Sequence, residues 1–166
     1  MALARTSGKR KRLTRRTQVS NRQRMFRIHG REVADFCDGL LEALDVADRA
    51  PSVAFVSRRV IQGLNRRYRG KDYPTDVLSF SCSAALEAER PFLGEIVIAP
   101  EVAAEQAVRW GTNLQDEMRT LLAHGLLHLL GFDHETDGGR MRRQQRRLLR
   151  GPAGVPAGIL AEPRGE

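Results

Sequence analysis

The chain has 166 residues, of which 41% are hydrophobic, and a formal net charge of +8. This length supports one domain with a hydrophobic core and is short for two. No apolar run reaches the roughly 20 residues of a membrane-spanning helix, and the N-terminus lacks the apolar stretch of a secretory signal. Two cysteines, Cys37 and Cys82, are too few for a disulfide framework. We therefore expect a cytoplasmic protein with no membrane contact.

The positive charge is concentrated in the first 31 residues, which contain eleven Lys or Arg and no acidic residue. The rest of the chain has 17 basic and 20 acidic residues and is slightly negative. Residues 1–16 have no hydrophobic period, so we expect a disordered basic arm. Such an arm commonly binds polyanions by counterion release, but a solvated tail and an organelle transit peptide fit the same composition.

Structural elements are predicted from residue 17 onwards. Residues 17–28 hold few apolar positions and predict a weak edge strand. Apolar residues at helical spacing predict an amphipathic helix over 32–45. The run S-V-A-F-V-S predicts a strand at 52–57, and renewed helical spacing predicts a helix over 58–67. Residues 68–76 contain Gly, Asp and Pro, which predict a loop.

The second half of the chain begins with two predicted strands. They cover 77–81 and 93–98 and are separated by a loop of about ten residues. A short helix over 101–110 is closed by Gly111, the residue type that most often ends a helix. The alternation of strands and helices predicts an α/β (α+β) fold, a single mixed sheet of three to four strands covered by helices.

Two further helices complete the predicted domain. Thr112 and Gln115 have the spacing of a capping box and predict the start of a helix over 114–130. A last helix over 137–149 is rich in arginine and precedes a Gly/Pro-rich tail, residues 151–166. The folded domain is therefore expected to cover roughly residues 17–150.

Three of the four histidines fall within eleven residues, at His124, His128 and His134. The first two are four residues apart, so on a helix they share one face. Gly131 can leave the helix through a left-handed conformation and let His134 return toward the same point. Three imidazoles without a fourth protein ligand are typical of a catalytic zinc site, which keeps one position open for water.

A structural role for these histidines is the simpler alternative. A lone histidine on an apolar helix face is usually a core residue with one hydrogen bond. Here, however, the pair lies within a run of leucines, where each unsatisfied buried polar group would cost about 1–3 kcal/mol. A bound metal removes this cost, so we predict one zinc ion on the long helix in the C-terminal half.

The spacing of the histidines matches that of the metzincin peptidases, with one consequential difference. In those enzymes a glutamate follows the first histidine and acts as general base. Here that position is Gly125. Asp133, Glu135 and Asp137 could substitute, but capping or histidine orientation explains each of them equally well. Peptide hydrolysis is therefore disfavoured, and for a phosphodiester substrate we expect a glutamate at position 125 to block cleavage by crowding the path of the phosphate.

A phosphodiester substrate requires positive charge near the reacting phosphate. Arginine supplies it with a planar, permanently charged group. The segment from Leu64 to Phe80 carries Arg66, Arg69 and Lys71 at the end of a helix and in the following loop. These cations are candidate contacts for the phosphates of such a substrate, although cations at a helix C-terminus also simply complement the helix dipole. The predicted loop position of Arg69 gives its side chain freedom to reach a phosphate.

Two motifs resemble those of a known family. The segment Asn65–Phe80 follows the pattern N-x-x-[YF]-R-x-K-x-x-P-T-[DN]-V-L-S-F, and His124–His134 follows H-G-x-L-H-L-x-G-[YF]-D-H. Both resemble the YbeY-type endoribonucleases, which are rRNA maturation factors, and the resemblance covers roughly residues 17–150. The arginine-rich final helix differs from these relatives, in which it is often acidic.

The resemblance implies a zincin-like α/β fold with a metal held by His124, His128 and His134. It also implies cleavage of single-stranded RNA, 16S rRNA 3′-end processing and late ribosome quality control, with Arg69 as the functionally important arginine. The expected partners are an rRNA precursor and the small ribosomal subunit, and no small-molecule cofactor other than the metal is expected. Two alternatives stay open: a metallopeptidase, and a non-catalytic ribosome assembly factor with a structural zinc.

Overall fold

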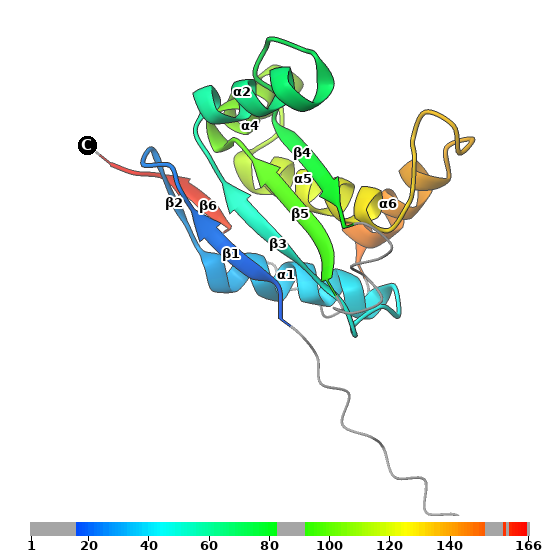
Figure 1. Cartoon of the computed structure of the whole chain (residues 1–166). Helices are drawn as coiled ribbons and strands as arrows, with labels where there is room; N and C mark the ends of the chain where they lie inside the picture. The colour runs from blue at the N-terminus through cyan, green and yellow to red at the C-terminus, as the bar shows by residue number, and fades with distance from the viewer. Residues whose placement is uncertain (1–15, 83–91, 152–157, 159, 166) are drawn as a thin grey trace, which may run out of the picture.

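A four-stranded mixed sheet forms the centre of the computed structural model, which describes residues 16–82, 92–151, 158 and 160–165 (Figure 1). Its strand order is β1-β3-β5-β4, in which β1, β3 and β5 are parallel and β4 is antiparallel to β5. The strands are β1 (Gln18–Asn21), β3 (Ala50–Phe55), β4 (Val77–Ser81) and β5 (Phe92–Ile98). The predicted fold class is therefore confirmed, and β1 lies at the predicted edge.

A second, two-stranded ladder joins the two ends of the described chain. Strand β2 (Phe26–Ile28) pairs antiparallel with β6 (Ala161–Pro163), and Leu160 and Ala161 are fully buried. The expected tail of residues 151–166 thus contributes a strand, and the folded unit extends past Arg150. The expected disordered arm lies outside the described residues, except for Arg16.

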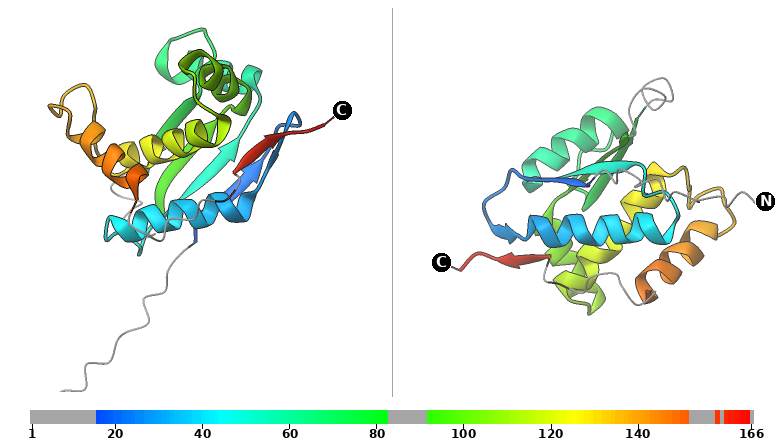
Figure 2. Two further views of the ribbon diagram at one scale, coloured as in Figure 1. Left: turned by 180° about the vertical axis from the view of Figure 1, so that it is seen from behind. Right: turned by 90° about the horizontal axis from the view of Figure 1, so that it is seen from below.

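Helices cover both faces of the sheet (Figure 2). Helices α1 (Gly30–Ala43), α5 (Leu114–Leu129) and α6 (Arg140–Arg150) share the larger hydrophobic cluster with one face. Helix α2 (Arg58–Arg69) packs on the other face in a smaller cluster, and α4 (Pro100–Trp110) contributes Val102 to this cluster and Ala103 to the larger one. No helix in the described part of the chain is long and apolar enough to cross a membrane.

Side chains alternate between the two clusters along the central strands. Val53 and Phe55 of β3 enter the larger cluster, whereas Ala54 between them enters the smaller one. Ile96 and Val97 of β5 are divided in the same way. This period of two is what a strand buried on both faces requires, and it holds α5 firmly against one side of the sheet.

Two local predictions were wrong. Helix α2 continues to Arg69 and ends at Gly70, whose φ is 68°, so Arg69 lies in the last helical turn and not in the loop. The predicted capping box at Thr112 and Gln115 does not form. Instead, the side chain of Asn113 accepts a hydrogen bond from the backbone N–H of Asp116 at 2.9 Å and begins α5.

The side chain of Gln115 has a tertiary role in place of capping. Its Oε1 accepts a hydrogen bond from the backbone N–H of Leu160 at 2.6 Å, and its Nε2 donates to the carbonyl of Ala161. Gln115 therefore fastens the segment that leads into β6 to the first turn of α5. Asn113, closer to the helix start, satisfies the backbone donor instead.

Candidate metal centre

The C-terminal end of α5 positions the candidate site. Leu130 ends the helix, and Gly131 follows with a φ of 89°. The N–H of Gly131 donates to the carbonyl of His128, and the N–H of Phe132 donates to the carbonyl of Leu127, both at 3.0 Å. This pair of bonds is a Schellman motif, which reverses the chain after a left-handed residue. The predicted role of Gly131 in turning the chain is therefore confirmed.

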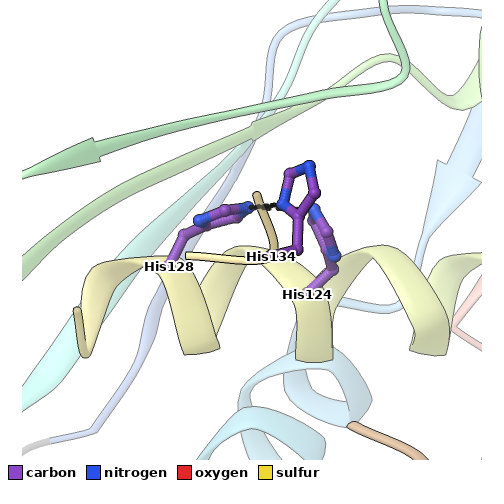
Figure 3. A group of neighbouring side chains, drawn as sticks. All are labelled: His124, His128 and His134. Atoms are coloured by element: carbon purple, nitrogen blue, oxygen red, sulfur yellow. Dashed lines mark hydrogen bonds between the residues drawn. The ribbon is translucent and has the colours of Figure 1, made fainter. Parts of the chain in front are cut away.

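The reversed chain brings His134 back to the two histidines of α5. The three side chains converge above the helix (Figure 3), and their candidate ligand atoms all lie within 4.8 Å of one another. The Nε2 atoms of His124 and His128 are 3.1 Å apart, and Nδ1 of His134 is 3.3 Å from Nε2 of His128. His134 is exposed, whereas the other two are half-buried, so the group opens to solvent on the His134 side.

The remaining ring nitrogens of the helical pair have partners that orient them. Nδ1 of His128 lies 3.0 Å from the carbonyl of Phe132, which can only accept, so Nδ1 donates and Nε2 keeps its lone pair. Nδ1 of His124 lies 3.2 Å from Oε1 of Gln145 on α6, and the same assignment follows. Both helical imidazoles therefore direct an unprotonated Nε2 toward the centre of the group.

Burial favours the neutral form of these imidazoles. It lowers the pKa of His124, and the neighbouring His134 and the Arg69 guanidinium lower it further, against the raising effect of Gln145 and Asp76. Burial also lowers the pKa of His128, with further lowering from the other two histidines and from Arg69. Neutral imidazole is the form that binds a metal.

The donor set fits a divalent metal such as zinc. Nitrogen ligands of tetrahedral zinc are about 3.3 Å apart, because each Zn–N bond is about 2.0–2.1 Å long. The two short separations in the group agree with this spacing. Two lone pairs that face each other repel without a proton or cation between them, and a metal ion at this point relieves that repulsion. The three histidines can therefore hold a metal ion.

Two of the acidic residues near the histidines, Asp133 and Asp137, accept hydrogen bonds from the backbone. Asp133 accepts bonds from the N–H of Glu135 and the hydroxyl of Thr136, both at 3.0 Å, and the first of these bonds is the main reason its pKa is lowered. Asp137 accepts from the N–H groups of Gly139 and Met141 and so begins α6. Both carboxylates shape the loop that carries His134, as the capping interpretation of the sequence requires.

The predicted cations lie at the end of α2 near this group. Burial is the main cause of the lowered pKa values of both helical histidines, and the charge of Arg69 adds the smallest of the further contributions. Arg66 instead forms an exposed ion pair with Asp72 at 4.0 Å. Lys71 follows the helix cap, and its backbone N–H donates a hydrogen bond to the carbonyl of Asn65. Among the three predicted cations, only Arg69 has a described electrostatic effect on the histidines.

The ring of Tyr68 fixes the last turn of α2 against the sheet. It packs edge-on against Phe80 of β4, with ring centroids 5.1 Å apart, and the Arg67 guanidinium lies 5.3 Å from its centroid. The buried side chain of Asn65 donates to the carbonyl of Tyr73 at 2.8 Å and holds the following loop. These contacts fix the backbone position from which the Arg69 side chain extends.

A model of the family described as Endoribonuclease YbeY matches residues 18–151, most of the chain. The chain belongs to the endoribonuclease YbeY family. This match confirms the family predicted from the two motifs, and with it the enzyme class. The matched range includes the three histidines, Arg69 and the whole of α6.

Curated relatives and a solved structure agree with this assignment. The protein named Endoribonuclease YbeY from Sulfurovum sp. (strain NBC37-1) is 40% identical over 121 residues, which cover 71% of this chain and 82% of the relative. The one from Alkaliphilus oremlandii is 36% identical over 148 residues, or 79% and 93% of the two chains. The solution structure of TM1509 from Thermotoga maritima is similar in fold, with a TM-score of 0.57 and 27% identity over 80% of this chain and 86% of that one.

Sequence reasoning missed two groups that orient the site, namely the amide of Gln145 and the carbonyl of Phe132. The carbonyl follows from any helix that ends in a Schellman motif, so the Gly131 signal could have located it. Gln145 carried no signal beyond being a polar, uncharged residue in an arginine-rich helix. Its role depends on how α6 packs on α5, which the sequence does not specify.

Proposed function

We propose that this chain is a zinc-dependent endoribonuclease that cuts single-stranded RNA. Its proposed role is maturation of the 16S rRNA 3′ end and late ribosome quality control in the cytoplasm, with an rRNA precursor and the small ribosomal subunit as partners. The observation that carries this proposal is the convergence of His124, His128 and His134 within 4.8 Å in a chain of the endoribonuclease YbeY family.

Each residue of the proposed site has a separate role. His124, His128 and His134 hold the metal, and Gln145 and the Phe132 carbonyl keep two of the rings in the ligating orientation. A bound zinc ion supplies activated water near neutral pH and polarises a phosphoryl oxygen. Arg69 contributes fixed positive charge where negative charge grows on the phosphate during cleavage.

The metallopeptidase alternative finds less support at the site. The residue after His124 is glycine, and it is buried against the sheet, so the usual carboxylate base is absent and has no room there. Asp133 is held by backbone and side-chain donors that lower its pKa, which makes it a weak base. A purely structural metal fits poorly with the exposure of His134.

The test uses purified protein, a fluorescent single-stranded RNA, the same RNA as a duplex, and casein. We expect cleavage of the single strand only, loss of cleavage with a chelator, and recovery with zinc. His128→Ala is expected to lose both metal and cleavage. His29→Ala is the matched control, because His29 bonds Glu162 in the small ladder and is not part of the group.

Each alternative has its own outcome. Casein cleavage by the wild-type protein with intact RNA supports the peptidase. Stoichiometric zinc without hydrolysis of either substrate supports the assembly factor. Native protein without zinc, nickel or copper above background would overturn the metal centre itself.

A further inference from the structure

A cavity of about 280 Å³ adjoins the metal centre on the side of α6. Two of the three histidines, His124 and His134, form one part of its wall, and α6 forms the rest. The α6 residues that line it are Met141, Arg142, Gln145, Arg146 and Leu149. None of the lining residues is acidic, so the cavity combines the open side of the histidine group with two arginines.

Helix geometry explains why these five residues share one wall. They occupy positions i, i+1, i+4, i+5 and i+8, which lie on one face of a helix. Met141 is buried in the core, and Gln145 bonds His124, so the face is anchored at two points. Arg142 and Arg146 lie beside these anchors, four residues and about 6 Å apart along the axis.

The positive charge of this pair has no acidic partner among the described residues. Other arginines of α6 have internal contacts: Arg143 donates to the carbonyl of Gly138 at 3.1 Å, and Arg140 lies 6.0 Å from the ring centroid of Phe132. No ion pair involves Arg142 or Arg146 in the part of the chain that the structure describes. Like charges four residues apart on a helix are mildly destabilising, so this arrangement favours an external anion.

We propose that Arg142 and Arg146 bind backbone phosphates of single-stranded RNA next to the bond that is cut. This inference rests on the proposed function, to which it adds the direction of the strand's path from the histidines along α6. Arginine suits the role because its planar group donates two hydrogen bonds to one phosphate. The apolar side chain of Leu149 closes the far end of the wall and can pack against a ribose or base.

The test compares two double variants of the zinc-loaded protein that remove the same charge from the same helix. Arg142→Gln with Arg146→Gln empties the cavity wall of charge. Arg147→Gln with Arg150→Gln is the control, because these two exposed arginines do not line the cavity. Zinc content and thermal unfolding of both variants verify that the fold is unchanged.

Binding is measured by fluorescence anisotropy with a labelled single-stranded DNA 12-mer, which carries the same phosphates and is not a ribonuclease substrate. We expect the cavity variant to bind on the order of tenfold more weakly at 0.1 M salt, and its slope of log affinity against log salt to fall by roughly 1.4, since each lost phosphate contact on a single strand removes about 0.7. The control is expected to lose less than about threefold.

Cleavage of the matching RNA supplies the second readout. The cavity variant should raise KM and leave kcat nearly unchanged, because contacts with flanking phosphates act in the ground and transition states alike. Equal weakening in the two double variants would overturn the inference, since a general field of the helix would then explain it. A fall in kcat with unchanged KM and unchanged DNA binding would also overturn it.

Failure of the proposed function gives a different pattern. If the wild-type protein leaves RNA intact but binds the 12-mer through Arg142 and Arg146, the phosphate site stands and the ribonuclease proposal fails. If the wild-type protein cuts RNA and the cavity variant behaves as the control does, only the phosphate site is lost.

Discussion

Gly125 of α5 lies directly against Ile96 of β5. A Cβ atom at position 125 would meet Cγ2 of Ile96 at 2.8 Å and Oγ of Ser79 at 3.1 Å. The glycine therefore allows the histidine helix to approach the sheet closely. The loss of cleavage expected for a glutamate at this position stays a prediction, but its cause changes, because such a side chain would displace the helix before it could reach a phosphate.

Gly125→Ala is therefore expected to destabilise the protein. Overpacking costs about 1–3 kcal/mol, and the better helix propensity of alanine offsets about 1 kcal/mol of this, so we expect a net loss of up to about 2 kcal/mol in the free energy of unfolding. Gly63→Ala in α2 is the matched control, because a Cβ there meets nothing within 4 Å. It should stabilise by about 0.5–1 kcal/mol. Urea unfolding of both variants checks this, and a stabilised Gly125→Ala would contradict it.

Gln145 is expected to tune metal affinity without being a ligand. Gln145→Leu removes the acceptor that orients His124, and loss of such a partner typically weakens metal binding 10–100-fold. Gln144→Leu is the control. The side chain of Gln144, next to Gln145 in the sequence, makes no hydrogen bond among the described contacts and does not line the cavity. Competition with a zinc chelator of known affinity measures both. Equal zinc affinity in the two variants would show that the His124–Gln145 contact is dispensable.

Arg69→Ala is expected to fold and hold zinc normally yet cut RNA about 10²–10³-fold more slowly in kcat, the usual cost of one lost charge contact in the transition state. Arg59→Ala, at an exposed position in the first turn of the same helix, is the control and should keep its rate. Single-turnover cleavage at saturating RNA distinguishes them. Near-normal turnover of Arg69→Ala with full zinc content would remove Arg69 from the mechanism.

The basic arm should govern RNA affinity and leave the chemical step unchanged. Arg16 pairs with Asp35 and Asp38, so a deletion of residues 2–15 preserves these contacts and removes six cations. We expect weaker RNA binding and a salt slope reduced by up to about 4, at about 0.7 per contact, with little change in the rate at saturating RNA. An unchanged salt slope would identify the arm as a solvated tail or targeting segment.

Glu117 gives a prediction about pH. Burial raises its pKa above the ordinary value of 4.5, and the charge of Asp76 adds to the effect. The folded protein therefore holds this proton more tightly than the unfolded chain does, and the stability this proton provides is lost as the pH rises from 4.5 through the raised pKa. Glu117→Gln should thus raise Tm at pH 8, and the gain should shrink toward pH 4.5.

The exposed Asp48→Asn variant is the control for this experiment and should show no such trend. Calorimetry of both variants at several pH values gives the comparison. A gain in Tm for Glu117→Gln that is the same at pH 4.5 and pH 8 would contradict the assigned cause.

The helices and central strands could be predicted because their signals are local. The pattern of apolar residues in α1 and the His124–His128 spacing in α5 each depend only on helical periodicity. The sequence prediction ended α2 at Arg67 and assigned Tyr68 to the following loop. The helix is two residues longer, because Gly70 ends it only after Arg69. The return of His134 to the other two histidines was predicted correctly, because a glycine directly after a helix most often adopts a left-handed conformation that reverses the chain.

Features that depend on distant partners could not be predicted. Strand β6 has only three residues, and nothing in A-E-P indicates a strand without its partner β2. Gln115 has the residue type of a capping box, but its side-chain amide forms hydrogen bonds with the backbone of Leu160 and Ala161 instead. The contact between Gln145 and His124 requires the relative rotation of two helices, which is decided by packing and not by either helix alone.

The small ladder of β2 and β6 limits how early the fold can be completed during synthesis. Arg27 pairs with Glu162, about 135 residues later in the chain, which a ribosome makes in roughly 7–27 s at 5–20 residues per second. During this interval the backbone groups of β2 have no partner strand to bond. Helix α5, which carries His124 and His128, is likewise translated before Leu160 and Ala161, so its first turn is fastened only after these residues have been made.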